Sequence, residues 1–516
     1  MKAWRWLLVL PLIAALASPA LGQERNFSRG GAGNYRPGAG HHGDFYGGGF
    51  LPGLLLGGAA AAAHARDQEF YDPPPRPRHI RRPPPDWMES DEAPPPRHRP
   101  HRARPVVMES EAPPRRKKPP PIFAPARARL PALAEQRLAP DEILVAFQAE
   151  KVGQAQDFAR GQKLDLVEAR GLKLIGVTVY RLKLPRGGDL RKTLRRAGRD
   201  ARLAWAQPNY YYQLQEPDAP ASSPPPQPET KDSPAVAPAP EGYAGAALNL
   251  AEAHKRARGQ GVAVAVIDSQ VDAAHPELAG VAVENFDAIG TPGAAHTHGT
   301  AMAGAISGHV KLAGAAPAAR LLAVRAFDPG GGGARGATLN ILAGLDWAAD
   351  KGAKVVSMSF AGPPDPLMEK MVLAATGKGM VVIAAAGNEG PGAPPQYPGA
   401  YAPVIAVGAV DENAKIYSRG NRGAYIKLAA PGVDVLAAAP NGGYDLSTGT
   451  SIACAEISGV AALVLEKNPS LDLAALRKIL RDSARKIVGE ADLGEADAAA
   501  ALARSPSPLS GEGVSR

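Results

Sequence analysis

The stretch Val262-Ala263-Val264-Ala265-Val266-Ile267-Asp268-Ser269 decides the fold, because six apolar residues run directly into an acid. A short continuous apolar run predicts a strand that is buried on both faces. Four more runs of this kind follow, at 321–326, 355–358, 381–385 and 404–407. Helix-like stretches lie between them, at 301–306, 338–349 and 366–376, and Thr338 is the candidate N-cap of the second. This alternation predicts an α/β fold, a mostly parallel sheet with helices on both faces and right-handed crossovers.

Four polar residues stand where this fold places its chemistry, at the carboxyl ends of strands. Asp268 ends the first strand, Asn388 follows the strand at 381–385, and His298 and Ser451 each stand near the start of a predicted helix. Singly, an Asp or Ser at such a place is more often a cap. Together they are what acyl transfer needs, because a serine needs an imidazole to take its proton and the imidazole needs a carboxylate. An Asn amide and a helix-start N–H can stabilise the oxyanion.

The motifs around these residues resemble those of the subtilisin-like serine peptidases over residues 244–503, and the order Asp, His, Ser is that of subtilisin. The stretches that match are Val266-Ile267-Asp268-Ser269, His298-Gly299-Thr300, Ala386-Gly387-Asn388 and Gly449-Thr450-Ser451-Ile452-Ala453. The resemblance implies that Ser451 is the nucleophile, His298 the general base and then acid, and Asp268 the orienting carboxylate. It also implies that Asn388 and the Ser451 N–H bind the oxyanion.

The same resemblance extends to substrate binding. Ser359, Phe360 and Ala361 are similar to the strand against which an extended peptide pairs by backbone hydrogen bonds. Four positions depart from the family pattern: Gln270 and Ala361 stand where Gly is usual, and Ala455 and Glu456 replace Pro-His. If position 270 needs a positive φ, Gln costs stability there. Ala361 is expected to narrow the specificity pocket, and Glu456 to place a negative charge near the site.

Residues 138–215 predict a small α+β domain of the split-βαβ kind, from the order β-α-β-β-α-β. It is similar to the inhibitory propeptide of this family, and Gln207-Pro208-Asn209-Tyr210 strengthens the likeness. The resemblance implies a self-processing zymogen whose own propeptide is an intramolecular inhibitor. The cut is expected between Gln213 and Tyr243, in or beside the Pro-rich linker 216–243.

The N-terminal part predicts export. Residues 1–22 have the basic start, apolar run and small residues of a signal peptide, so the protein is expected to be secreted, periplasmic or envelope-associated. Residues 23–137 are rich in Gly, Pro and Arg, which predicts a disordered region, and 504–516 predict a flexible tail. A second apolar stretch at 50–63 is too short for a membrane span and leaves weak envelope association open.

Charge and cysteine content exclude several classes of protein. Residues 23–137 hold 19 Lys and Arg against 12 Asp and Glu, whereas the part from 138 onward holds 38 of each. The basic charge therefore belongs to the N-terminal region, and nucleic acid is not an expected partner. The single Cys454 excludes a disulfide framework and a Cys-rich zinc site.

The sequence therefore predicts a serine endopeptidase that acts on proteins or peptides and requires no cofactor. The resemblance leaves calcium open, although no clear run of oxygen ligands supports it. The alternative is a weak or inactive subtilisin-like scaffold that binds the envelope through its Pro/Arg-rich region.

Overall fold

The computed structural model describes residues 128–214, 242–330 and 333–506. The signal peptide, the segment 50–63, most of the Gly/Pro/Arg-rich region, nearly all of the linker and the end of the tail lie outside these residues, so the expectations for them stay predictions. No helix within the described ranges combines the length and the apolar character that crossing a membrane requires.

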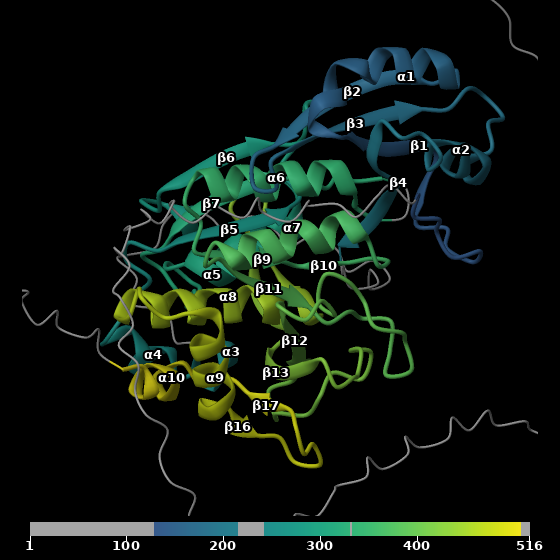
Figure 1. Ribbon diagram of the computed structural model, residues 1–516. Helices are drawn as coiled ribbons and strands as arrows, with labels where there is room; N and C mark the ends of the chain where they lie inside the picture. The colour runs from purple at the N-terminus through teal and green to yellow at the C-terminus, as the bar shows by residue number, and fades with distance from the viewer. Residues whose placement is uncertain (1–127, 215–241, 331–332, 507–516) are drawn as a thin grey trace, which may run out of the picture. The chain divides into compact units, whose positions relative to one another are not determined.

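A sheet of nine strands forms the centre of the larger part, in the order β16-β17-β13-β12-β11-β9-β5-β7-β6 (Figure 1). Its strands are β5 (Ala263–Asp268), β6 (Val283–Asp287), β7 (Arg320–Arg325), β9 (Val355–Met358), β11 (Val381–Ala385), β12 (Ile405–Val410), β13 (Ile426–Pro431), β16 (Arg485–Lys486) and β17 (Gly494–Glu495). All neighbours are parallel except β16 and β17. The five predicted strands correspond to β5, β7, β9, β11 and β12, whose residues are all buried except Arg320 at the start of β7, so these strands and the mostly parallel sheet are confirmed.

Side chains of β5 alternate between two hydrophobic cores, one on each face of the sheet. Val264 and Val266 point into the core that contains α3 (Tyr243–Ala247), α4 (Leu250–His254), α5 (Thr297–Ser307), α8 (Thr450–Lys467), α9 (Leu473–Ser483) and α10 (Ala498–Arg504). Ala265 and Ile267 point into the core with α6 (Thr338–Asp350) and α7 (Pro366–Gly377). Strand side chains alternate with a period of two, so a run apolar at every position requires cover on both faces. The prediction of helices on both faces is confirmed.

Two expectations about local structure are settled by backbone geometry. The predicted N-cap of α6 is wrong: Ala337 is the N-cap and Thr338 is the first helical residue. The Thr338 hydroxyl instead donates to the buried Asp365 carboxylate at 2.6 Å, a long-range bond that helix signals cannot reveal. Gln270 is not among the described residues with positive φ, so this position does not require glycine.

The smaller part, up to Leu214, is a sheet with two helices on one face. It contains β1 (Leu138–Phe147), a 3₁₀ turn η1 (Ala149–Gln154), α1 (Ala155–Gln162), β2 (Asp165–Leu172), β3 (Val177–Lys183), α2 (Leu190–Ala197) and β4 (Leu203–Leu214). The strands are antiparallel in the order β4-β1-β3-β2, and the predicted element order is confirmed. One face packs on α1 and α2 through Phe158 and Leu194. The other face shares a core with α6 and α7, in which Leu144 and Trp205 lie with Leu339.

Short elements at the rim complete the fold. Strands β8 (Arg335–Ala337) and β10 (Phe360–Ala361) both pair with β4, so this strand leaves the small sheet and continues into the larger part. A 3₁₀ turn η2 (Pro276–Leu278) follows β5, and β14 (Val435–Ala439) and β15 (Gly443–Ser447) form a hairpin before α8.

Candidate active site

A buried acid and a buried imidazole meet at the carboxyl end of the central sheet. Asp268 is the last residue of β5, and His298 lies in the first turn of α5. His298 Nδ1 lies 2.8 Å from Asp268 Oδ1, and the His298 side chain is only 5% exposed. The same Oδ1 accepts hydrogen bonds from the backbone N–H and the hydroxyl of Ser269, at 2.8 and 3.1 Å. Three donors on one oxygen fix the orientation of this carboxylate, and the carboxylate in turn orients the imidazole.

Ser269 also connects Asp268 to the start of α5. Its hydroxyl accepts a hydrogen bond from Gly299 N at 3.0 Å and lies 3.1 Å from His296 Nδ1. His296 is the N-cap of α5, and its Nδ1 accepts from His298 N at 3.3 Å. A Cβ on Gly299 would lie 2.5 Å from the Ser269 carbonyl oxygen, so only glycine allows this approach. Sequence reasoning missed Ser269, because an Asp-Ser pair at a strand end does not show which hydroxyl will face the helix.

Ser451 opens the long central helix of the larger part. Gly449 turns the chain into α8 with a φ of 148°, a conformation that favours glycine. Ser451 follows in the first turn, buried, and its hydroxyl lies 3.2 Å from the Ser359 carbonyl oxygen. In return, the Ser359 hydroxyl donates to the Ser451 carbonyl at 3.0 Å. Since α8 packs against α5, Ser451 and His298 stand in the first turns of two neighbouring helices.

The amide of Asn388 is held by Thr450, the residue before Ser451. Asn388 Oδ1 accepts hydrogen bonds from Thr450 N and from the Thr450 hydroxyl, both at 3.0 Å. The Thr450 hydroxyl also accepts from Gly387 N at 3.1 Å. With its oxygen bound in this way, the amide is fixed in orientation, and its NH₂ is the part of the side chain that can donate hydrogen bonds. Thr450 is a second positioning residue that the sequence did not single out, although it lies inside a quoted motif.

The expected substrate strand already has a partner in this structure. Phe360 is aligned with Leu214 of β4, and Ala361 is aligned with Gln213. On its other edge β4 pairs with β8, and Leu214 N donates to the Ala334 carbonyl at 3.1 Å. The last residues of β4 therefore lie as an extended strand between two strands of the larger part, in the way an extended peptide binds by β-augmentation.

Tyr212 anchors this strand. Its ring is fully buried and meets Phe360 edge-on, with the centroids 5.6 Å apart. A Cβ on Gly362 would lie 2.4 Å from the Tyr212 ring, so the glycine makes room for it. The groove between β8 and β10 therefore accepts an aromatic side chain two residues before the last described residue of β4.

Two side chains of β4 cover the starts of the helices beneath them. Gln207 Nε2 donates to the buried Asp365 carboxylate at 2.8 Å, and its Oε1 accepts from Leu367 N, in the first turn of α7, at 3.2 Å. Asn209 Oδ1 accepts from Leu339 N, in the first turn of α6, at 3.4 Å. Helix starts have backbone N–H groups without intrahelical partners, so these contacts satisfy donors that would otherwise need water.

Two residues of α8 near Ser451 have no direct place in this arrangement. Cys454 is fully buried, and burial raises the pKa of its thiol to about 11, which keeps the thiol protonated and unreactive. Glu456 is also buried, and its side chain lines a cavity of about 130 Å³ together with Tyr243 and Asp434. The lining residues of this cavity include neither His298 nor Ser451. Glu456 therefore belongs to the lining of this cavity, and its expected effect on the active site stays a prediction.

No group of three or more His, Cys, Asp or Glu residues in the described ranges is arranged to hold a metal ion. Glu277, in η2, has its carboxylate occupied by protein donors. It accepts hydrogen bonds from the backbone N–H groups of Val310, Lys311 and Leu312 and from the Tyr444 hydroxyl. Independence from cofactors stays a prediction.

Comparison with known proteins decides the family. Residues 259–503 match the sequence model of the subtilase family, Peptidase_S8. Subtilisin BL of Lederbergia lenta is 37% identical over 232 residues, which cover 43% of this chain and 83% of that protein. The chain belongs to the subtilase family. Thermitase of Thermoactinomyces vulgaris is 37% identical over 233 residues, covering 44% of this chain and 81% of thermitase. M-protease of Shouchella clausii is 38% identical over 229 residues, which are 43% of this chain and 58% of that protein.

A solved subtilase-like structure shows the same fold. The crystal structure of fervidolysin from Fervidobacterium pennivorans, a keratinolytic enzyme related to subtilisin, superposes with a TM-score of 0.61 and 24% identity. The superposition covers 74% of this chain and 64% of fervidolysin, a larger share of this chain than the curated relatives cover. The predicted family, a family of serine endopeptidases, and the predicted fold class are thus confirmed.

Proposed function

We propose that the protein is an exported serine endopeptidase that hydrolyses peptide bonds through an acyl-enzyme on Ser451. The observation that carries this proposal is the buried pair of His298 and Asp268, 2.8 Å apart, in a chain of the subtilase family. Asn388, in the segment after β11, is hydrogen-bonded to Thr450, the residue before Ser451 at the start of α8. Protein and peptide chains are the proposed substrates, because the groove between β8 and β10 accepts an extended backbone.

In the proposed reaction, His298 accepts the proton of the Ser451 hydroxyl while the oxygen attacks the substrate carbonyl. The imidazolium then gives this proton to the leaving amine as the C–N bond breaks, and water releases the acyl group by the same route in reverse. Asp268 keeps the imidazole in the required tautomer. Asn388 and the Ser451 N–H donate to the oxyanion, and one such donor typically contributes about 10²–10³ in rate.

We further propose that residues 138–215 inhibit the enzyme until they are removed. The contacts that support this are those of β4, which takes the place of a substrate strand beside Phe360 and Ala361. A strand bound there excludes other chains from the groove. The peptide ahead of β4 is also fixed by its own folded sheet, which shares a core with α6 and α7. Binding of a preorganised strand costs less conformational entropy than binding of a flexible substrate.

The register of β4 suggests where the precursor is cut. Leu214 is aligned with Phe360, and Ser359, one residue earlier, has its carbonyl 3.2 Å from the Ser451 hydroxyl. An antiparallel strand that continues in this register brings the next residue of the chain opposite Ser359. We therefore expect the cut within about two residues after Leu214, at the beginning of the predicted window. Export by residues 1–22 and weak envelope association of the N-terminal region stay part of the proposal on sequence grounds alone.

The test is intact mass and N-terminal sequencing of the wild-type precursor beside Ser451→Ala, together with labelling by a fluorophosphonate. Ser458→Ala is the matched control, because Ser458 is a buried serine of the same helix whose hydroxyl donates to the Cys454 carbonyl. We expect wild type and Ser458→Ala to be labelled and processed, and Ser451→Ala to be neither. Casein cleavage or labelling that persists in Ser451→Ala would refute the assignment.

A further inference from the structure

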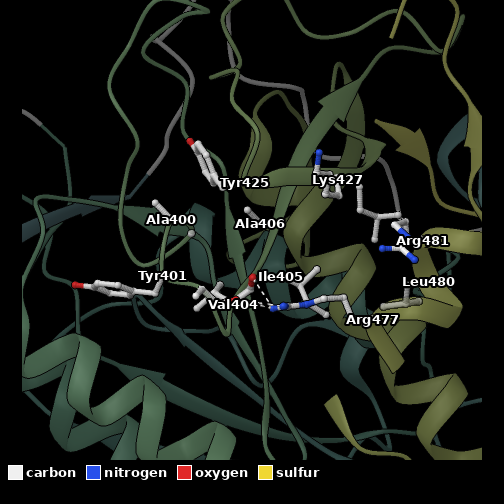
Figure 2. A pocket seen from close by; sticks show the side chains of 13 residues that line it. Ala400, Tyr401, Val404, Ile405, Ala406, Tyr425, Lys427, Arg477, Leu480 and Arg481 are labelled. Carbon is white, nitrogen blue, oxygen red and sulfur yellow. Dashed lines mark hydrogen bonds between the residues drawn. The ribbon is translucent and has the colours of Figure 1, made fainter. Parts of the chain in front are cut away.

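A cavity of about 180 Å³ lies between the central sheet and α9, outside the proposed active site (Figure 2). Part of its wall is apolar, formed by Val404, Ile405, Leu428 and Leu480. A cavity of about 150 Å³ can hold benzene, so this one has room for an apolar group of five or six carbons. Charged side chains also line it, those of Lys427, Arg477 and Arg481.

Arg477 is the most buried of these charged groups. Its guanidinium donates to the backbone carbonyl of Ala402 at 3.2 Å. It also donates to the backbone carbonyl of Val404 at 2.9 Å, and Figure 2 shows Arg477 pointing toward Val404. No ion pair between Arg477 and a carboxylate occurs among the described residues. Burial lowers the pKa of this guanidinium, which means that its positive charge is poorly compensated. A half-buried cation held only by carbonyl dipoles favours a nearby anion.

Two more cations, Lys427 and Arg481, line the same cavity, and no acidic residue lines it. Lys427 is paired with Asp492 and Arg481 with Asp482, but these pairs are exposed to solvent and hold their partners weakly. Tyr425 contributes no charge, because burial raises the pKa of its phenol and its hydroxyl donates to the Ala386 carbonyl at 3.1 Å. The polar side of the cavity is therefore positive, and its other side is apolar.

We propose that this cavity binds a carboxylate carried on a short apolar group. The carboxylate would lie against Arg477, Lys427 and Arg481, and the apolar group would enter the space beside Val404 and Leu480. Two sources share this chemistry: a short fatty acid, and the C-terminal residue of a peptide with an apolar side chain. The cation cluster on its own would accept any anion, whereas the apolar wall selects amphipathic ones.

The experiment measures binding to the full-length chain carrying Ser451→Ala, which keeps the protein intact, by isothermal titration at low salt. The probes are hexanoate and N-acetyl-leucine, which represent the two sources. Three further probes each lack one feature: hexanol has no charge, hexylammonium has the opposite charge, and inorganic phosphate has no apolar chain. We expect hexanoate, N-acetyl-leucine or both to bind at least tenfold more tightly than each of these three control probes. The carboxylate that binds more tightly identifies the source.

The variants test which side chains recognise the carboxylate. Lys427→Gln with Arg481→Gln removes the two exposed cations without touching the backbone contacts of Arg477, and we expect at least tenfold weaker binding. Lys378→Gln, an exposed lysine at the end of α7, is the control and should bind as the parent does. Four results would each overturn the proposal. They are that hexanol binds as tightly as hexanoate, that phosphate binds as tightly as the carboxylates, that neither carboxylate binds, or that the double variant keeps the affinity of its parent.

Discussion

Glu456 provides the most direct test of how burial controls a charge in this protein. Its side chain is buried in the middle of α8, and Oε2 has no hydrogen-bond partner within the part of the chain that the structure describes. Desolvation by burial, with a smaller contribution from Glu495, raises the pKa of this carboxyl well above its ordinary value. We therefore expect Glu456 to be protonated in the folded protein at a pH where it is ionised in the unfolded chain.

The sign and size of the effect follow from proton linkage. At pH values between the pKa of Glu456 in the unfolded chain, about 4.3, and its higher pKa in the folded protein, the folded state binds one proton more than the unfolded state. The free energy of unfolding therefore falls as the pH rises. One proton changes the free energy of unfolding by about 1.4 kcal/mol for each pH unit. Above about pH 5.5, Glu456 should therefore lower the free energy of unfolding by up to this amount per pH unit until its folded pKa is reached. Glu456→Gln cannot ionise and should not show this loss.

The assay is urea unfolding at several pH values in the Ser451→Ala background, which prevents self-digestion. The quantity to follow is the difference in the free energy of unfolding between Glu456→Gln and its parent. Other titrating groups, including the buried Asp365, are present in both proteins and cancel in this difference. It should grow in favour of Glu456→Gln as the pH rises, whereas the exposed Glu412→Gln should give a constant difference. A constant difference for Glu456→Gln as well would refute the reasoning.

Four other predictions follow from hydrogen bonds described above. Asn388→Ala should lower kcat by a factor of about 10²–10³, measured on a fluorogenic peptide. Thr450→Val removes one bond that orients Asn388 and should lower kcat about tenfold, with little change in KM, in the same assay. Glu277→Ala should lower the free energy of unfolding by about 3 kcal/mol in urea titration, because four donors lose their common acceptor. Gln207→Ala should weaken the binding of β4 to the larger part by about 2 kcal/mol, or roughly 30-fold, because Asp365 loses a donor. It should therefore shorten the delay between folding of the precursor and the appearance of peptidase activity.

Each of these four has an outcome that contradicts it. Equal kcat in Asn388→Ala and its parent would show that the amide does not take part in the reaction, and equal kcat in Thr450→Val and its parent would show that the Thr450 hydroxyl does not orient it. If Glu277→Ala unfolds at the same urea concentration as Glu412→Ala, a variant at an exposed site, the segment 310–312 does not depend on the Glu277 carboxylate. Gln136 is an exposed glutamine in the same part of the chain, and Gln136→Ala is the control. If the delay before activity in Gln207→Ala is no shorter than in Gln136→Ala, the Gln207 bond does not contribute to the binding of β4.

The sequence predicted the elements whose pattern is fixed by burial alone. The strands at 262–267 and 381–385 are apolar at every position because both faces are covered, and β5 and β11 lie there. The hairpin of β14 and β15 was not predicted, because the Gly443–Ser447 strand is mostly polar and only partly buried, so it has no apolar run to reveal it. Thr338 was misassigned for a related reason: a threonine at a helix start signals a cap, and only the fold brings Asp365 to its hydroxyl.

The candidate site shows the same division between what local sequence contains and what the fold adds. Asp268, His298, Asn388 and Ser451 could be named because each stands in a motif at an element boundary. The residues that orient them, Ser269 and Thr450, could not, because their roles depend on bonds to groups about 30 and 60 positions away in the chain. Motif spacing constrains which residue types occur together but not which neighbour donates to which oxygen.

If the precursor is processed as proposed, the contacts of Asp365 explain how the groove remains formed after β4 has left. Asp365 accepts from four donors, and three of them, Leu367 N, Met368 N and the Thr338 hydroxyl, belong to the larger part of the protein. Only the fourth, from Gln207, departs with β4. The carboxylate that caps α7 therefore keeps three of its four hydrogen bonds, and the start of α7 stays fixed. In the proposed zymogen, this network would lose only the Gln207 bond at Asp365 and would present a preorganised groove to substrates afterwards.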